Sequence, residues 1–195
     1  NTVWAFATAG VATQALYAAV AEVAVRSGLA GFSPQNLVNT VWAFATAGVA
    51  ADALYAAVAE AAVRSQLAGF NSQNLANMVW AYATADYCHQ ALLAQCLRTV
   101  SASLAQDPSG WSSEHHSQLH QWQLWLSLER GEDGQQYLLP DSQRQLCRDA
   151  MVANLARPSG LQRSVAAALT SVQHGFEEEY LEPLTGYSLD LAIPS

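Results

Sequence analysis

The chain of 195 residues is long enough for one large or two small domains with hydrophobic cores of their own. It has eight arginines, no lysine and sixteen acidic residues, so its net charge of −8 argues against binding nucleic acid mainly through phosphates. No apolar run is long enough to cross a bilayer, and no membrane partner is expected.

The first part of the chain is an internal repeat. Residues 1–38 and 39–76 are identical at 31 of 38 positions, and residue 77 opens a third copy that reads NMVWAYATADY. A period in this range is typical of helix pairs stacked into an array, and such arrays bind other molecules more often than they catalyse reactions. The phase of the repeat places residue 1 inside a helix, so we expect the sequence to be part of a longer protein.

The second copy shows where its two helices begin and end. Ser33 is a good N-cap, Pro34 suits the first helical position and Gly48 follows the last turn, which predicts a first helix over about 34–47. A second, alanine-rich helix is predicted from residue 51 or 52 to about residue 65, with apolar residues at helical spacing facing inward.

Large aromatic side chains recur in the repeat. Trp42, Phe44 and Tyr55 are expected to fill the space between helix layers. Trp4, Trp42 and Trp80 occupy equivalent positions, and we interpret them as core residues rather than as platforms for stacked bases. On that basis Trp42→Ala should cost about 3–5 kcal/mol of unfolding free energy.

The later part of the chain departs from the repeat. In the third copy Asp86 stands where the earlier copies have glycine. Further helices are expected at 89–104, from residue 112 or 113 until a Gly-rich loop, at 141–154 and at 161–172, with a linker at 157–160. Residues 178–182 and 187–193 alternate apolar and polar side chains around Thr185-Gly186, which predicts a β-hairpin that needs other elements to lie on.

Two sets of motifs resemble one known family. The unit with NTVWAFATAG and FSPQNL resembles the octotricopeptide repeat of green-algal and other organellar RNA-binding proteins. The tail, with PSGLQRSVAAALTSV and EEYLEPLTGYSLDLAIP, resembles the start of a RAP domain, which occurs after such repeats in that family and in the related FAST-kinase-like organellar proteins. The resemblance covers residues 1–104 and 158–195.

This resemblance implies a mainly α protein. Residues 1–106 would form an α-solenoid of antiparallel helix pairs, 107–157 a degenerate helical connector, and 158–195 the first part of an α/β RAP domain of the restriction-endonuclease-like fold. Asp190 lies where such folds place their first metal-binding acid, but the strand that supplies the next acids is absent from the sequence. The resemblance therefore implies no enzyme, no cofactor, no bound metal and no small-molecule substrate.

The implied function is binding of single-stranded RNA in a mitochondrion or chloroplast, in support of the processing, stability or translation of organellar transcripts. The alternative is a protein-interaction scaffold of the same architecture, which the net charge and the absence of lysine favour. A nuclease completed by residues outside this sequence is a third, weaker hypothesis.

Candidate RNA contacts follow from how helical-repeat proteins read bases, with two or three side chains from the first helix of each pair. The polar strip of that helix is Gln35, Asn39 and Thr46, with Asn36 and Thr40 alongside. Amides can donate and accept at once, but a recurring asparagine can equally bond the neighbouring turn. The candidates in full are Gln35, Asn36, Asn39, Thr40, Gln73, Asn74, Asn77, Arg26, Arg64 and Arg98.

The three arginines of this set recur near the predicted ends of the second helices. In that position they can follow phosphates or interact with the helix dipole. Nearly identical repeats that read bases should also prefer a repeated base.

Other chemical signals are weak. His116 and His120 are spaced i, i+4 on a predicted helix, but no HExxH pattern or cysteine partner completes a zinc site. Cys88, Cys96 and Cys147 form no CxxC pair and are expected to be free, buried thiols.

Overall fold

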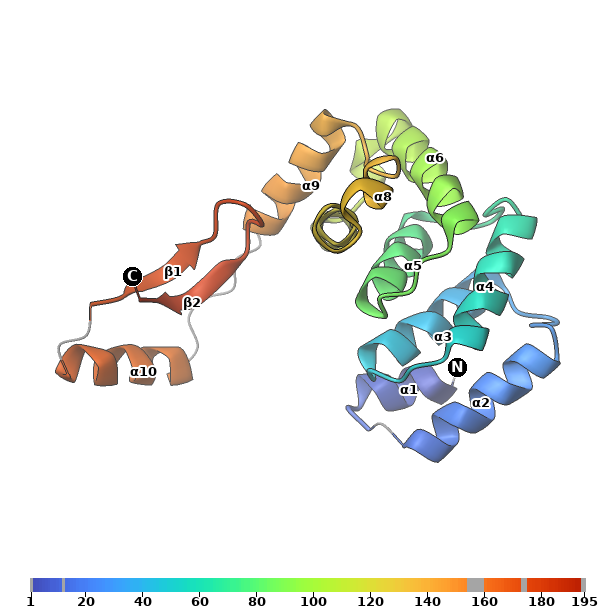
Figure 1. Ribbon diagram of the computed structural model, residues 1–195, viewed down its shortest axis with the longest axis horizontal. Helices are drawn as coiled ribbons and strands as arrows, with labels where there is room; N and C mark the ends of the chain where they lie inside the picture. The colour runs from blue at the N-terminus through green and yellow to red at the C-terminus, as the bar shows by residue number, and fades with distance from the viewer. Residues whose placement is uncertain (1, 12, 154–159, 173–174, 194–195) are drawn as a thin grey trace.

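The structure is a computed structural model that describes residues 2–11, 13–153, 160–172 and 175–193. The protein is mainly helical, with a small two-stranded antiparallel sheet near its C-terminal end (Figure 1). The helices are α1 (Thr2–Thr8), α2 (Gln14–Arg26), α3 (Pro34–Thr46), α4 (Asp52–Arg64), α5 (Ser72–Thr84), α6 (Gln90–Gln106), α7 (Ser113–Leu124), α8 (Gly131–Gln135), α9 (Asp141–Ala153) and α10 (Gly160–Ser171). The strands are β1 (Glu177–Leu181) and β2 (Ser188–Ala192).

Local side-chain chemistry explains where the first helix of each pair begins. The Ser33 hydroxyl accepts the Asn36 N–H, the Asn71 side chain accepts the Asn74 N–H, and Ser112 caps α7 in the same way. The predicted helices are confirmed to within about two residues at each described end. No helix in the described ranges is both long and apolar enough to cross a membrane.

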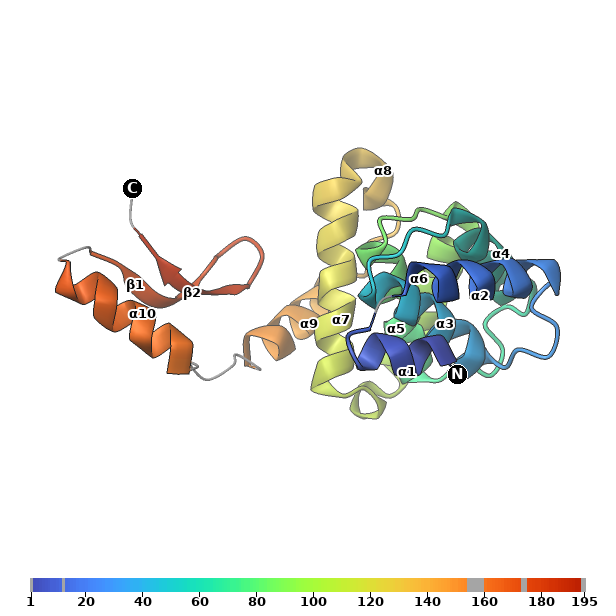
Figure 2. The ribbon, with the colours of Figure 1, turned by 90° about the horizontal axis from the view of Figure 1, so that it is seen from below.

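The helices pack in two rows. The first helices of successive pairs, α1, α3, α5 and α7, contact one another in that order, and so do the second helices α2, α4 and α6 (Figures 1 and 2). Each helix therefore packs mainly on its counterparts in the neighbouring copies and on its own partner. Figure 2 shows α7 running beside α5, with α9 packed against α7.

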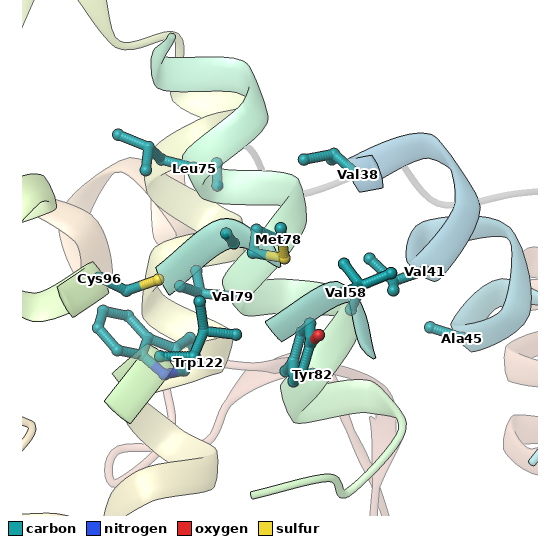
Figure 3. Packing of buried hydrophobic residues seen from close by; sticks show 14 of the residues in the cluster. Val38, Val41, Ala45, Val58, Leu75, Met78, Val79, Tyr82, Cys96 and Trp122 are labelled. Carbon is teal, nitrogen blue, oxygen red and sulfur yellow. The ribbon is translucent and has the colours of Figure 1, made fainter. Parts of the chain in front are cut away.

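The core runs continuously between these helices. Figure 3 shows Val41 of α3 beside Val58 of α4, and Met78 and Tyr82 along α5 with Trp122 of α7 beyond them. All five side chains are buried. The aromatic contacts repeat as well: Tyr17 meets Phe44 edge-on at 4.9 Å between ring centroids, and Tyr55 meets Tyr82 in the same way at 5.3 Å.

The recurring tryptophans lie at the edge of this core, so the prediction that placed them inside it is only partly confirmed: Trp42 and Trp80 pack against the buried cluster. Trp42 and Trp80 are only half-buried, and Trp4 is 43% exposed. The reason is helical register: Trp42 lies three residues after Asn39 and four before Thr46, which puts it on the polar side of α3. The buried tryptophans are instead Trp111, Trp122 and Trp125.

The region after α6 differs from its predicted form. Helix α7 continues into a π-helical turn, Trp125–Glu129, and the expected Gly-rich loop is the short helix α8. Gly134 of α8 permits this packing, because a Cβ there would lie 2.0 Å from the Leu126 carbonyl oxygen. Within the described residues, Cys96 and Cys147 are buried but Cys88 is exposed, which corrects the expectation of three buried thiols.

Asp86 ties the third copy to this region. It has a left-handed backbone, with φ of +52°, at the position where the earlier copies have Gly10 and Gly48 with φ of +68° and +63°. Its carboxylate accepts the Trp125 indole N–H at 2.8 Å and pairs with Arg130. The Arg130 guanidinium in turn lies 4.7 Å from the Trp125 ring centroid.

The predicted hairpin is confirmed; β1 begins and ends one residue earlier than expected, and β2 is one residue shorter at each end. Glu177 pairs with Ala192 and Leu181 with Ser188, and Gly186 has the positive φ that its turn requires. The turn reaches the helical part of the molecule, where His120 Nε2 lies 2.6 Å from the Thr185 carbonyl oxygen. Arg148 donates to the Pro183 carbonyl at 3.0 Å. Most of the linker predicted at 157–160 lies outside the described residues.

Candidate functional site

One side of the first-helix row carries a repeated set of polar and aromatic side chains. On α3 these lie at positions i, i+4, i+7 and i+11, which is the spacing of a single helix face. The equivalent residues of α5 follow 38 positions later. We call this face the polar strip; it consists of Gln35, Asn39, Trp42, Thr46, Gln73, Asn77, Trp80 and Thr84.

Every residue of the polar strip is exposed or half-buried. On the opposite side of α3, Val41 and Phe44 are fully buried, so the core fixes the rotation of the helix and therefore what the strip presents. The two tryptophan rings lie 6.2 Å apart between centroids with a tilt of 33°. The strip thus combines neighbouring aromatic rings with amide groups at a constant spacing.

Helix α7 contacts the α5 end of the polar strip through two hydrogen bonds. Gln118 donates to the Asn77 side-chain oxygen at 2.8 Å, and Gln121 accepts the Trp80 indole N–H at 2.6 Å. These glutamines occupy the α7 positions that correspond to Asn77 and Trp80. Asn77 therefore bonds a side chain of a neighbouring helix, not the neighbouring turn that the sequence offered as the alternative.

Two predicted contact residues lie inside the molecule. Thr40 is 2% exposed, and its hydroxyl donates to the Asn36 carbonyl oxygen at 2.7 Å. Asn74 is 7% exposed and caps α5 together with Asn71. Neither belongs to the polar strip, because both face the interior side of their helix. Gln35, Asn36 and Gln73 are exposed, whereas Asn39 and Asn77 are half-buried.

The arginines lie on the second helices, not on the helices that carry the polar strip. Arg26 and Arg64 end α2 and α4 and pair with Glu22 and Glu60 at 3.2 and 3.5 Å. Arg98 lies in the middle of α6 and donates to the Gln95 side chain, so the prediction that it ends its helix is wrong. The structure therefore does not bring these cations together with the amides.

The remaining candidates also have defined places. Asp190 is exposed on β2, between Leu189 and Leu191, which pair with residues of β1. His116 and His120 are buried, and each contacts a backbone carbonyl oxygen, that of Ser112 or Thr185. Burial lowers the pKa of His120. Among the described residues no cluster of three metal-ligating side chains occurs.

Burial shifts the pKa values of the interior cysteines and tyrosines. Burial raises the pKa of the Cys96 and Cys147 thiols to about 12. It also raises the pKa of Tyr55 and Tyr82, whose hydroxyl groups donate to backbone carbonyls instead. These thiols and hydroxyl groups therefore stay protonated at neutral pH, and the polar strip remains the candidate site on the helix pairs.

Sequence reasoning missed the tryptophans as members of this site. Their spacing of three residues after the asparagines could have indicated that both residues lie on one helix face. Comparisons with known proteins add nothing to the geometry: the chain matches no protein-family model, no curated protein and no solved structure.

Proposed function

We propose that the protein is an RNA-binding helical-repeat protein, an α-solenoid whose polar strip contacts single-stranded RNA. The observation that carries the proposal is the pair of neighbouring, half-buried tryptophans, Trp42 and Trp80, flanked by amides at the repeat spacing. Aromatic rings stack on bases of any sequence, and amides can bond base edges. The contacts between successive first helices support the solenoid.

The charge distribution defines the mode of binding. The polar strip contains no charged residue, and Arg26 and Arg64 already pair with glutamates on the second helices. Binding would therefore rely on stacking and hydrogen bonds more than on phosphate contacts, with a shallow salt dependence. Because the copies are nearly identical, the strip would prefer a run of one base.

The biological setting that we propose is the maturation, stability or translation of transcripts in a mitochondrion or chloroplast. It is supported by the resemblance of the repeat and of the tail to proteins that act there. Helix α10 followed by the β1–β2 hairpin agrees with the element order expected for the start of a RAP domain.

The proposal is tested by fluorescence anisotropy with labelled ten-nucleotide RNA homopolymers. We expect one homopolymer to bind best and Trp42→Ala to weaken it about tenfold, since stacking contributes about 1–3 kcal/mol per base. Asn39→Ala tests the amide. Gln90→Ala, an exposed amide on α6, is the control and should bind like the parent chain. Equal binding of all homopolymers, unchanged by Trp42→Ala, would refute the proposal.

A protein-interaction scaffold is the second candidate function. It is favoured by the net charge of −8 and by the uncharged strip, which offers no counter-charge to a phosphate backbone. The same assay separates the two: a chain that binds no RNA probe at low salt, with its helical structure intact, favours the scaffold.

A further inference from the structure

A cavity of about 500 Å³ lies away from the polar strip, at the junction between the helical part and the hairpin. Its walls are one face of α7 with the π-helical turn that follows, one face of α9, and the hairpin turn at Leu184. Figure 1 shows this turn reaching the end of α9. Small-molecule sites are typically concavities of about 300–1,000 Å³, so the volume suits a ligand the size of a nucleotide.

The hydrogen bonds that hold the hairpin turn also shape the cavity. Arg148 of α9 donates to the Pro183 carbonyl oxygen, and His120 of α7 contacts the Thr185 carbonyl oxygen. Three leucines, Leu124, Leu128 and Leu184, form the apolar part of the wall. The cavity therefore has an apolar side and a side with hydrogen-bond donors.

Arginine residues supply the charge of the polar side. Arg144 and Arg148 lie on successive turns of α9, and both line the cavity. The acidic residue of the lining, Asp141, pairs with Arg144, but its side chain is 92% exposed and therefore well screened by solvent. Glu182 lies near Arg148, but its carboxylate already accepts N–H groups of Leu184 and Thr185.

Two lining residues also carry buried donors that have no acceptor in the described part of the chain. Gln123 is 4% exposed; its side-chain oxygen accepts the Leu139 N–H at 2.7 Å, which fixes the amide, while its Nε2 has no partner. The Nε of Arg144 is likewise buried and has no acceptor in the described part of the chain. Buried donors without acceptors are costly and uncommon. Both unmatched atoms are donors, and both belong to residues that line the cavity.

We propose that this cavity binds a free organic phosphate of nucleotide size. Arg144 and Arg148 would contact the phosphate oxygens, and the base or another apolar part would lie against Leu124, Leu128 and Leu184. Guanidinium groups suit this role because their donors match the geometry of phosphate oxygens. The proposal is independent of RNA binding by the polar strip, since no residue is shared between the two sites.

The test is calorimetric titration of the full chain with uridine monophosphate, uridine and inorganic phosphate in parallel. We expect the monophosphate to bind and to raise the melting temperature, and uridine and inorganic phosphate each to bind at least about tenfold more weakly. Equal binding of uridine and its monophosphate, or no binding of the monophosphate at about 1 mM, would overturn the proposal.

Variants locate the site. Arg144→Gln should weaken the monophosphate about tenfold, whereas Arg64→Gln, which removes an exposed arginine of α4, should not. Leu128→Trp is a second test that needs no loss of charge: this side chain is half exposed, so the larger ring should fill the cavity without disturbing the core and abolish binding. Full affinity in a folded Leu128→Trp chain would also overturn the assignment.

Discussion

The first two copies of the repeat have nearly the same sequence but different surroundings. Phe6 of α1 is 37% exposed, whereas its counterpart Phe44 of α3 is fully buried. The difference comes from Tyr17, which covers the Phe44 ring edge-on, and from the position of α3 between α1 and α5. In a repeat array the sequence of a unit determines its helices, but the neighbouring units determine what is buried.

The largest expected effect is on the free energy of unfolding when the two phenylalanines are replaced. Phe44→Ala should lower the free energy of unfolding by about 3–5 kcal/mol, because it leaves a cavity where a buried ring packs against Tyr17. Phe6→Ala, the same change in the exposed copy, should cost less than half as much. Urea denaturation of both variants decides the matter, and equal losses would contradict the dependence on neighbours.

The second prediction compares tryptophans. Trp122→Ala should cost about 3–5 kcal/mol because the ring is fully buried in α7. Trp42→Ala should cost only about 1–2 kcal/mol, since the ring is half-buried and rests on Trp80. This value replaces the larger cost that the sequence predicted for a core residue. Denaturation curves that rank Trp42 above Trp122 would restore the core interpretation.

A smaller effect is expected where the third copy differs from the second. Tyr82 occupies the position of Phe44, and its hydroxyl donates to the Tyr55 carbonyl oxygen at 2.7 Å. Tyr82→Phe should therefore lower the free energy of unfolding by about 1 kcal/mol. Phe44→Tyr is the reciprocal variant. A neutral Tyr82→Phe would show that the buried bond adds nothing beyond the packing of the ring.

The smallest effect concerns α7, where His120 takes the place of Val41 and Val79 in the earlier copies. Burial lowers the pKa of His120, so the unfolded chain takes up a proton at a higher pH than the folded chain. The free energy of unfolding should thus decrease as pH falls from about 7 to 5. His120→Gln should flatten this dependence in pH-resolved melts; an unchanged slope would assign it to other groups, such as His115.

The parts of the fold that could be predicted are those with local causes. Ser33, Pro34 and Gly48 delimit a helix through bonds and backbone preferences within a few residues, and the turn at Thr185-Gly186 defines a hairpin in the same way. The hydrogen bonds of Gln118 and Gln121 to the polar strip could not be predicted, because they join residues 41 positions apart. They depend on the packing of α7 against α5.

The part of the candidate site that follows from local helical spacing could also be predicted. Helical spacing alone grouped Gln35, Asn39 and Thr46, and the structure places them on one face. The same spacing includes Trp42, but the general tendency of tryptophan to be buried outweighed it. Thr40 and Asn74 were included on residue type, although their register turns them inward.

The junction at Asp86 has a consequence for how such a chain can change in length. Its contacts reach forward to Trp125 and Arg130, so they anchor the irregular helices after α6 to the third copy. A whole 38-residue unit could therefore be gained or lost upstream without altering this anchor, because every unit offers its successor nearly the same face. Gain or loss of a unit would then lengthen or shorten the polar strip in steps of one unit, and the tail would stay in place.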